Sequence, residues 1–305
     1  MGMDAITRAT TEALKKLPVI KHLHSEPMSG HTSFKIGGPV RVMFFPENPD
    51  TLVRLCNLLR GYDLTPLTVG NGTNLLVADH AHDVVVIKMT GLGEIQETGD
   101  AEITAYSGAP LSEIAAFAYG RGLSGAEFMH GIPGTLGGAI MMNAGAYGCE
   151  MKDVVHATSA LAPETGMFRI TGAEHGFSYR SSRFTTTEDV IISSILRLHR
   201  DDKESIKARM DGYAGRRSLS QPLEFPSAGS TFKRPKEGYA AELIERAGLK
   251  GYSVGGAQVS AKHSGFVINR GAATFSDVMA VIGHVRETVN RLFGIDLEPE
   301  VRIIP

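Results

Sequence analysis

The stretch Leu123–Gly148, LSGAEFMHGIPGTLGGAIMMNAGAYG, is the part of the chain around which the rest is organised. Seven of its residues are glycines, and the others are almost all uncharged and small or apolar. Glycine accepts positive φ and lets the backbone approach another surface closely. Exposed backbone N–H groups in series also bind anions such as phosphate. Taken alone, the stretch is better explained as a tight structural crossing of strands, since it lacks the Walker pattern GxxxxGK[ST].

A second polar loop shifts this interpretation toward a ligand site. The sequence VGNGTNLLV, residues 69–77, places Gly70 to Asn74 directly after a short apolar strand expected at residues 67–69. Two such loops in one half of the chain indicate a large phosphate-bearing ligand lying between them.

The composition is that of an ordinary water-soluble protein. With 305 residues, two or three domains are expected. The hydrophobic and charged fractions are 42% and 21%. A formal net charge of −2 and a pI near 6.6 argue against a general nucleic-acid binder, so an anionic substrate must be held by local cations.

The chain shows no sign of membrane insertion, secretion or metal binding. No apolar run reaches the length of a membrane span. The amphipathic N-terminus contains Asp4 and Glu12 and does not resemble a secretory signal. Cys56 and Cys149 are the only cysteines and form no CxxC or metal-ligand spacing. We expect a reduced, cytoplasmic protein without a metal.

The first half of the chain alternates helices and strands, which predicts a small α/β unit. A covering helix is expected up to about Lys21, with Leu14, Leu17 and Ile20 on one face. Strands around Phe34 and Ile36 and over residues 40–45 are expected on either side of Gly37-Gly38. A helix is predicted over residues 50–60, and short buried strands over residues 67–69, 75–77 and 84–87.

The sequence after about residue 91 predicts a more antiparallel sheet, and the last third of the chain predicts a separate unit. Strands are expected at residues 103–106, 154–162, 168–170, 190–198, 257–259, 266–268 and 301–304. Helices are expected at residues 111–119, 201–217, 239–247 and 276–293. The last has Thr274 as its N-cap and Val278, Ile282, Val285, Val289 and Leu292 on one face. We predict an α+β protein with domains at 1–90, 91–200 and 218–305, and a connector at 201–217.

Three polar stretches remain outside the predicted core. FSYRSSRF, residues 177–184, contains Arg180; QPLEFPSAGSTFKRP, residues 221–235, contains Ser230; and the terminal LEPEVRIIP contains Glu298 and Glu300. Each has a simple structural explanation on its own: a solvated arginine, a turn serine and exposed carboxylates. No GxSxG elbow supports a hydrolase.

Together, these stretches resemble those of one family. The motifs, in order, are HTSFKIGGP, VGNGTNLLV, GIPGTLGGAIMMNAGAYG, YRSSRF, PSAGSTFKRP, AELIERAGLKG, VSAKHSGFVIN and LEPEVRI. They are similar to those of the UDP-N-acetylenolpyruvoylglucosamine reductases, also called UDP-N-acetylmuramate dehydrogenases or the MurB family. The resemblance extends from His31 to the end of the chain. No room exists between Arg180 and Ser230 for the extra tyrosine loop of one form of the family, so the chain resembles the shorter form.

The resemblance implies a two-part FAD-binding region of the vanillyl-alcohol-oxidase (PCMH) type, followed by an α/β substrate-binding domain. It implies catalytic positions at Arg180, Ser230 and Glu300. The implied contacts to FAD are Val69, Gly70, Asn71, Gly72, Thr73, Asn74, Gly131, Pro133, Gly134, Thr135, Gly137, Gly138, Asn143 and Ala144. Cations around the serine loop are expected to bind the substrate, chiefly Lys233, Lys262 and His263, beside Arg234 and Lys250.

The implied reaction belongs to peptidoglycan precursor synthesis and so to cell wall biogenesis, cell shape and cell division. NADPH reduces non-covalently bound FAD and leaves, and the flavin then delivers hydride to UDP-N-acetylglucosamine-enolpyruvate. The product is UDP-N-acetylmuramate. A cytoplasmic monomer that binds neither nucleic acid nor membrane is expected.

The residue types suit this chemistry. Hydride addition beside a carboxylate builds an enolate-like charge, which the permanently charged, planar guanidinium of Arg180 can stabilise. Glu300 can assist if it is protonated, which burial favours. The Ser230 hydroxyl can protonate the neighbouring carbon because the acceptor is a strong base. FAD performs the hydride step itself.

Two alternatives belong to other classes. One is an oxidase or dehydrogenase of a small alcohol or hydroxy acid with a covalent flavin, for which His130 and Cys149 are the candidate attachment residues. The other is a nucleotide- or sugar-binding module without catalysis.

Overall fold

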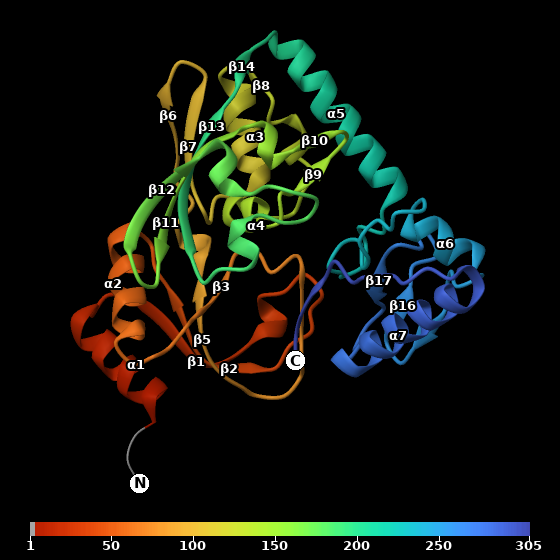
Figure 1. Ribbon diagram of the computed structural model, residues 1–305, viewed down its shortest axis with the longest axis horizontal. Helices are drawn as coiled ribbons and strands as arrows, with labels where there is room; N and C mark the ends of the chain where they lie inside the picture. The colour runs from red at the N-terminus through yellow and green to blue at the C-terminus, as the bar shows by residue number, and fades with distance from the viewer. Residues whose placement is uncertain (1–3) are drawn as a thin grey trace. The chain divides into compact units, whose positions relative to one another are not determined.

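The computed structural model describes residues 4–305, which form two compact units (Figure 1). Unit 1 contains residues 4–24, 41–70 and 83–215, and unit 2 contains residues 25–40, 71–82 and 216–305. Two segments from the first third of the chain therefore fold with the C-terminal third. The three domains expected from the sequence, 1–90, 91–200 and 218–305, do not include this interleaving. As functional domains they stay a prediction.

The first part of unit 1 packs two helices on a sheet. Helix α1 (Ala5–Lys16) begins at Asp4, whose side chain accepts a hydrogen bond from Thr7 N at 2.8 Å, and α2 (Pro49–Arg60) begins at Asn48 in the same way. The sheet has the order β1-β2-β5-β3, and β3 runs parallel to β5. Its strands are β1 (Lys21–Pro27), β2 (Pro39–Phe45), β3 (Leu67–Val69) and β5 (His82–Lys88). The helices and strands share one core, to which Ala9, Val42, Leu55 and Ile87 belong.

Three expectations for this part need correction. Helix α1 ends at Lys16 rather than near Lys21, because Leu17 precedes Pro18 and residues before proline avoid the helical region. Strand β1 was missed because its sequence KHLHSEP is mostly exposed and carries no apolar alternation. Phe34 and Ile36 form no strand; they are buried in the core of unit 2 from an irregular segment.

The second part of unit 1 is an antiparallel sheet in the order β12-β11-β13-β7-β6, which confirms the expected antiparallel texture. Helices α3 (Leu111–Gly120) and α4 (Leu136–Met141) pack in its core. The strands are β6 (Ile95–Gly99), β7 (Glu102–Tyr106), β11 (Val155–Ala162), β12 (Gly166–Thr171) and β13 (Val190–Arg197). Two short pairs accompany it: β8 (Leu123–Ser124) with β14 (His199–Arg200), and β9 (Gly145–Ala146) with β10 (Cys149–Glu150).

Helix α5 (Lys203–Ser220) is fixed to the glycine-rich stretch along its first half. Arg209 donates to Glu127 Oε1 at 2.8 Å and to Asp201 Oδ2 at 2.5 Å. Burial raises the pKa of Glu127, but hydrogen bonds, among them those from Gly125 N and Arg209, bring it below its usual value. Tyr213 stacks on Tyr147 with 4.2 Å between ring centroids.

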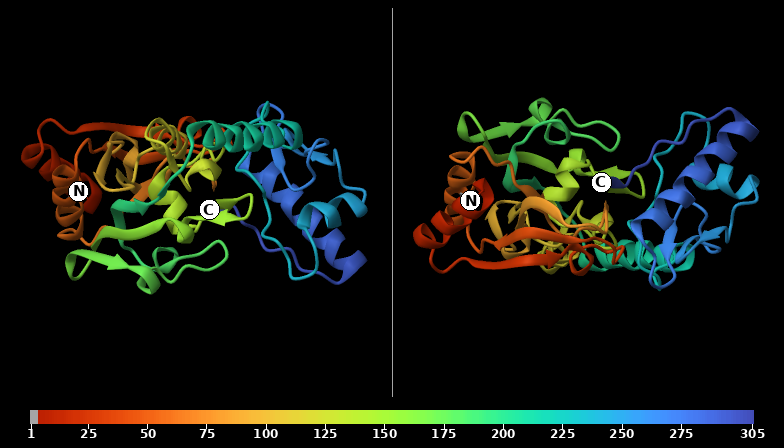
Figure 2. Two further views of the ribbon diagram at one scale, coloured as in Figure 1. Left: turned by 90° about the horizontal axis from the view of Figure 1, so that it is seen from above. Right: turned by 90° about the horizontal axis from the view of Figure 1, so that it is seen from below.

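Unit 2 is a small sheet covered by two helices. Strands β15 (Ser253–Val254), β16 (Ala257–Val259) and β17 (Val267–Asn269) form an antiparallel sheet, and α6 (Ala240–Arg246) and α7 (Phe275–Phe293) share its core. Figure 2 shows α7 as the long blue helix. Thr274 is its N-cap, as predicted, in a capping box with Asp277. Leu292 does not continue the buried face, because it is 49% exposed in the last turn.

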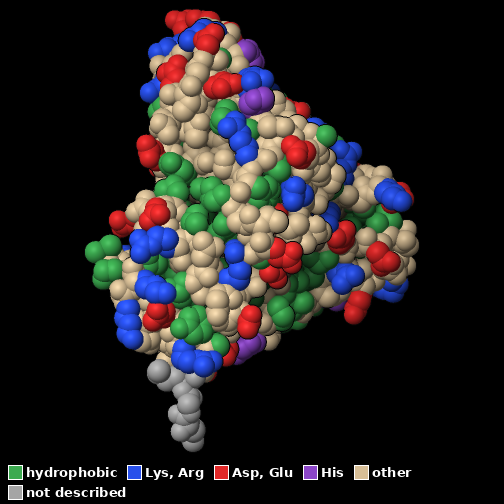
Figure 3. Space-filling model, turned by 60° about the vertical axis from the view of Figure 1, so that its left-hand side comes forward, with side chains coloured by type: hydrophobic (Ala, Val, Ile, Leu, Met, Phe, Trp, Pro, Cys, Tyr) green, Lys and Arg blue, Asp and Glu red, His purple; other side chains and the backbone are tan. Residues whose placement is uncertain are grey.

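The segment 71–82 belongs to unit 2 through backbone pairing. Strand β4 (Leu75–Val77) runs parallel to the terminal strand β18 (Arg302–Ile304). Past β4, the Asp79 carboxylate accepts from Phe275 N at 2.7 Å, at the start of α7. On the face of the molecule in Figure 3, cationic and anionic side chains are interspersed.

Candidate active site

The glycine-rich stretch is joined by backbone hydrogen bonds to the segment that enters α3. Gly137 N donates to Ser107 O at 2.8 Å, Leu136 N to Ala109 O at 3.0 Å, and Leu111 N to Gly134 O at 3.0 Å. Helix α4 therefore starts against residues 107–111, with Thr135 buried at its N-cap.

Two glycines allow close approaches that a larger residue would prevent. A Cβ atom on Gly70 would lie 2.0 Å from Thr135 Oγ1, and one on Gly137 would lie 2.9 Å from Ser107 Cβ. At Gly138 a Cβ would meet only Thr135 Oγ1, at 4.0 Å, and this residue is exposed. The structure thus brings the predicted cofactor residue Gly70 against the predicted cofactor residue Thr135, and leaves space beside Gly138.

Two buried polar atoms next to this region have no hydrogen-bond partner within residues 4–305. They are Ser107 Oγ and His130 Nδ1. Buried polar groups are nearly always hydrogen-bonded, so each needs a partner from outside the chain, a water molecule or a ligand. Ser107 was not predicted as a site residue. The sequence feature that could have indicated it is its position in YSGAP, residues 106–110, directly before the helix that contacts the glycine-rich stretch. The close glycine approaches and these orphaned atoms fit a bound polar cofactor.

The division between the units falls inside the first loop, after Gly70. In unit 2, Ser33 N donates to Gly72 O at 3.2 Å, and a Cβ at Gly72 would lie 2.1 Å from His31 O. Asn74 Nδ2 donates to Glu300 O at 3.1 Å, and Arg302 N donates to Asn74 O at 2.9 Å. The motifs HTSFKIGGP and LEPEVRI thus meet residues 71–74, NGTN, within unit 2.

Ser230 and Glu300 lie on adjacent segments of unit 2. An antiparallel bridge joins Phe232 to Pro299, and Glu300 N donates to Thr231 O at 2.8 Å. Thr231 is buried, whereas Ser230 follows Gly229, which has a φ of 75°, and is exposed. The segment after the serine loop forms only this isolated bridge and no longer strand. Through this bridge, Ser230 and Glu300 lie on neighbouring segments although they are far apart in the sequence.

The predicted substrate cations have partners in unit 2. Lys233 Nζ lies 2.5 Å from Glu298 Oε1, so the exposed Glu298 carboxylate forms an ion pair with this lysine. Lys262 Nζ donates to Ser218 O at 2.7 Å, near the C-terminus of α5. Burial lowers the pKa of His263, which favours a neutral ring at neutral pH, and its role at the substrate stays a prediction.

The other two cations of the predicted cluster also have contacts. Arg234 lies over the Tyr239 ring at 4.1 Å, and Lys250 pairs with Glu245 at 2.7 Å.

Arg180 occupies the corner of a tight turn in unit 1. Ser178 and Ser181 exchange backbone hydrogen bonds of 3.0 and 3.2 Å, and Arg180 has a φ of 54°. Its guanidinium carbon lies 5.1 Å from the centre of the Tyr179 ring.

The predicted cofactor residues Asn143 and Ala144 are engaged with the protein. Asn143 is 1% exposed and donates from Nδ2 to Glu150 Oε2 at 2.7 Å and to Ser178 O at 3.0 Å. Ala144 N donates to Ala139 O at 2.8 Å, and Ala144 O accepts from Met151 N at 2.9 Å. Their roles at the cofactor stay a prediction, and a contact of the Asn143 side chain to FAD would compete with these bonds.

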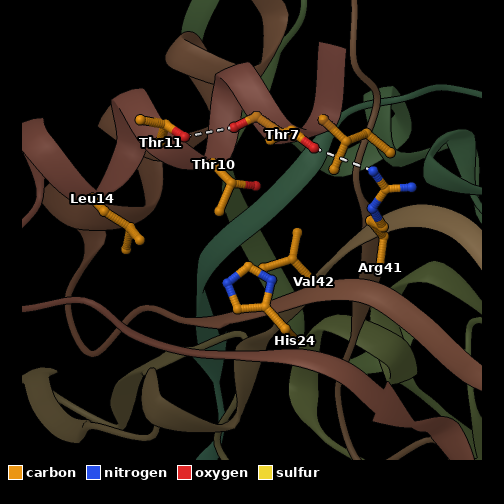
Figure 4. Close-up of a pocket in the computed structure, with 8 residues that line it drawn as sticks. Thr7, Thr10, Thr11, Leu14, His24, Arg41 and Val42 are labelled. Atoms are coloured by element: carbon orange, nitrogen blue, oxygen red, sulfur yellow. Dashed lines mark hydrogen bonds between the residues drawn. The ribbon is translucent and has the colours of Figure 1, made fainter. Parts of the chain in front are cut away.

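Two surface cavities of unit 1 have different surroundings. One of about 150 Å³ lies between α1 and strands β1 and β2, where Thr7, Thr10 and Thr11 face His24 and Arg41 (Figure 4). Another of about 300 Å³ lies beside Cys56, whose pKa burial raises to about 12. Drug-sized ligands occupy about 300–1,000 Å³, so the first is too small for a dinucleotide. None of the glycine-loop residues lines either one.

Three further observations bear on the classes considered from the sequence. Burial and nearby carboxylates raise the pKa of Cys149, which keeps its thiol protonated at neutral pH. Within residues 4–305, no three His, Cys, Asp or Glu side chains are grouped as a metal site. No helix in that range has the length and apolar character needed to cross a bilayer.

Comparisons with known proteins match both units. Residues 40–172 match the family model for an FAD binding domain, and residues 221–304 match that for the C-terminal domain of UDP-N-acetylenolpyruvoylglucosamine reductase. The reductase of that name from Caldanaerobacter subterraneus subsp. tengcongensis is 48% identical over 92% of each chain. That of Syntrophomonas wolfei is 43% identical over 96% of this chain and 98% of its own.

A solved structure agrees with these matches. The MurB reductase of Thermus caldophilus superposes with a TM-score of 0.78 at 30% identity, over 94% of this chain and 99% of its own.

Proposed function

The chain belongs to the UDP-N-acetylenolpyruvoylglucosamine reductase family, an FAD-dependent oxidoreductase family, and from that premise we propose its reaction in detail. The enzyme reduces UDP-N-acetylglucosamine-enolpyruvate to UDP-N-acetylmuramate with NADPH as the electron donor. The observation that carries the proposal is the adjacency of Ser230 and Glu300 in a unit whose sequence matches the C-terminal reductase domain.

Unit 1 is proposed to hold FAD through the glycine-rich stretch and the Val69–Gly70 turn. The close fit of Gly70 on Thr135 and of Gly137 on Ser107 supports this, as does the orphaned Ser107 hydroxyl. In unit 2, the Asn71–Asn74 segment is proposed to contribute as well. When bound, FAD accepts a hydride from the nicotinamide and delivers it to the substrate.

Arg180 is proposed to stabilise the negative charge that develops on the substrate carboxylate. A guanidinium stays charged throughout the working pH range and binds a carboxylate through two parallel hydrogen bonds. A positive group held in place by its turn before the reaction stabilises developing charge without reorganising. The left-handed backbone of Arg180 and the bonds across Ser178 and Ser181 fix that turn.

Ser230 is proposed to donate the proton to the carbon beside the developing enolate. Its exposure on a turn after Gly229 makes the hydroxyl accessible to a substrate, while the buried Thr231 holds the segment in place through Val267 N at 3.0 Å. Glu300, on the neighbouring segment, is proposed to stabilise the same developing charge in its protonated form. Lys233, Lys262 and His263 are proposed to bind the UDP-sugar, with His263 as a neutral group.

The cellular setting follows from the reaction. UDP-N-acetylmuramate is a peptidoglycan precursor, so we propose a cytoplasmic enzyme of cell wall biogenesis that serves cell shape and cell division. We propose a monomer of the shorter form of the family, which binds neither nucleic acid nor membrane. NADPH, rather than NADH, is the proposed donor.

The test is a steady-state assay with mass spectrometry of the sugar nucleotide. NADPH oxidation should depend on the enolpyruvyl substrate, and the product should be heavier by two hydrogen atoms. The same rate of NADPH oxidation with and without the enolpyruvyl substrate would contradict the proposal.

Two further measurements separate the alternative classes. Acid precipitation should release all of the flavin if it is non-covalent, because the Cys149 thiol is protonated and unsuited to attack. Flavin that stays with the pellet would favour the oxidase. A colourless purified protein would favour a binding module.

A further inference from the structure

The turn that carries Arg180 is attached to the C-terminal end of the glycine-rich helix α4. Ser182 Oγ donates to Met141 O at 2.9 Å, and Thr185 Oγ1 donates to the same carbonyl at 3.0 Å. Met141 is the last residue of α4, where carbonyl groups lack partners inside the helix. The same helix has Thr135 as its N-cap and Gly137 in its first turn, and both belong to the predicted cofactor contacts. Arg180 and those contacts are therefore parts of one connected structure in unit 1.

Asn143 holds the other side of the turn. Its Nδ2 donates to Ser178 O and to Glu150 Oε2, and its Oδ1 accepts from Lys152 N at 3.0 Å. Both amide protons and the amide oxygen are thus used, and a flipped amide would place its oxygen against a carbonyl and a carboxylate. Asn143 has a φ of 42° and is buried, so the surrounding structure must hold it in this conformation.

Glu150 supplies a negative charge next to this turn. Its carboxylate pairs with Lys152 Nζ at 2.9 Å, and its backbone N donates to Asp153 Oδ2 at 2.7 Å. Hydrogen bonds from Lys152 and Asn143, together with the positive charge of Arg180, hold the pKa of the Glu150 carboxyl below its usual value. The carboxylate is therefore ionised at neutral pH and lies beside the turn that carries Arg180, since Asn143 Nδ2 contacts both Glu150 Oε2 and Ser178 O.

We propose that Asn143 and Glu150 are positioning residues for the reaction: Asn143 fixes the Ser178–Ser181 turn, and Glu150 orients the Arg180 guanidinium. This inference rests on the proposed role of Arg180. Neither residue needs to touch the substrate, because each acts through Arg180. Asn143, predicted from the sequence as a cofactor contact, is assigned this role in its place.

The first test compares Glu150→Gln with the matched control Glu97→Gln. Glutamine keeps an oxygen that can accept from Asn143 but removes the charge beside the Ser178–Ser181 turn. Glu97 also pairs with an arginine of unit 1, Arg121 at 3.0 Å, outside this network. Without oxygen, flavin reduction by NADPH and flavin reoxidation by the enolpyruvyl substrate are timed separately. We expect Glu150→Gln to slow reoxidation about 10- to 100-fold, the scale of a misplaced catalytic group, and to leave reduction nearly unchanged. Glu97→Gln should change neither step.

The second test asks whether Glu150 acts through Arg180. Arg180→Lys should itself slow reoxidation, and in that background Glu150→Gln should cost much less than in the wild type. Asn143→Asp, which keeps the shape of the side chain but places an acceptor against Ser178 O, should resemble Glu150→Gln. Flavin content and circular dichroism should match the wild type in the Glu150 variant.

The outcomes separate this inference from the function on which it rests. If Arg180→Lys slows reoxidation and Glu150→Gln does not, the positioning role is wrong and the role of Arg180 stands. If Arg180→Lys leaves reoxidation unchanged, the proposed role of Arg180 is wrong, and the positioning role falls with it. Equal slowing of both half-reactions by Glu150→Gln, or loss of flavin, would also overturn the inference.

Discussion

The proposed site residues of the two units are held in different ways. In unit 1, Thr135 and Asn143 are buried, and Arg180 sits on a turn fixed by several hydrogen bonds. In unit 2, Ser230 is exposed, and Glu300 is linked to its surroundings through its backbone N and O. The difference agrees with the proposed division of roles, in which unit 1 positions the cofactor and Arg180, and unit 2 contributes Ser230 and Glu300. Substitutions in the glycine-rich stretch of unit 1 should then affect flavin binding and stability, whereas those at Ser230 and Glu300 of unit 2 should affect one chemical step.

Ser230→Ala should have the largest effect and the most selective one. Removing an exposed hydroxyl should leave packing and flavin content intact, and NADPH should reduce the flavin near the wild-type rate. Reoxidation by the enolpyruvyl substrate should slow by about 10²-fold or more, the usual scale for a positioned proton donor. Stopped-flow absorbance of the flavin without oxygen measures both steps.

Two variants complete that experiment. Ser230→Cys should recover part of the loss, because a thiol is the stronger acid. Ser253→Ala, at another exposed serine of unit 2, should behave like the wild type. Equal slowing of both steps by Ser230→Ala would make the serine structural and direct attention to Glu300.

The two terminal glutamates should differ. Glu300 lies opposite Thr231 and just before β18, while the Glu298 side chain forms an ion pair with Lys233. Glu300→Gln should lower kcat about 10-fold, equivalent to about 1.4 kcal/mol of lost transition-state stabilisation. Glu298→Gln should lower it about 2-fold at most, because ion pairs near the surface contribute little. A greater loss for Glu298→Gln in steady-state assays would reverse the assignment.

Two neighbouring glycines, Gly137 and Gly138, test whether the glycine-rich stretch of unit 1 holds the cofactor. Gly138→Ala has room within the protein, so it should keep the fold and lower flavin occupancy, while Gly137→Ala meets Ser107 and should destabilise the protein by about 1–3 kcal/mol. Gly134→Val should likewise lower flavin occupancy more than helix and strand content. Flavin absorbance per protein and urea unfolding measure these effects. Normal flavin binding by both Gly138→Ala and Gly134→Val would show that this stretch does not contact the cofactor.

A buried histidine in unit 1 should make stability depend on pH. His175 is fully buried, with its ring nitrogens hydrogen-bonded to Gly172 O at 3.0 Å and Thr158 Oγ1 at 2.9 Å, and burial lowers its pKa. The unfolded chain binds the proton more readily, so this contribution is present above about pH 6.5 and is lost as the pH falls toward the folded pKa. The slope from one such group is at most about 1.4 kcal/mol per pH unit.

Urea unfolding at several pH values measures that slope. His175→Asn should flatten it more than His263→Asn, because His263 is only partly buried. The same slope in both variants and the wild type would rule out His175 as its source.

The sequence predicted elements whose signals are local. Helices α2 and α7 follow from apolar spacing, and the start of α7 also follows from its Thr274 cap. Strand β1 has no such signal because it is polar and exposed. Phe34 and Ile36 have the alternating apolar pattern of a strand, but they lie in an irregular segment whose side chains pack in the core of unit 2. The interleaving of segments 25–40 and 71–82 with the C-terminal third depends on long-range contacts such as the β4–β18 pair, which no local pattern specifies.

The site was predicted mainly through the resemblance of motifs to a family. Ser230 and Glu300 could be named from those motifs, but their adjacency depends on the bridge between Phe232 and Pro299. The hydrogen bonds of the buried Asn143 side chain could not be read from the sequence, because an asparagine in a glycine-rich loop suits a cofactor contact as well as a buried protein contact. Ser107 and Glu150 were not named from the sequence for the same reason: the unpartnered Ser107 Oγ and the Glu150–Asn143 hydrogen bond arise only in the fold.

The visible spectrum of the purified full-length protein, recorded without oxygen, tests the central claim most directly. The account predicts flavin bands that disappear when one equivalent of NADPH is added and return when UDP-N-acetylglucosamine-enolpyruvate follows. Bands that NADPH bleaches but the enolpyruvyl sugar nucleotide fails to restore, or a protein without flavin bands, would contradict it.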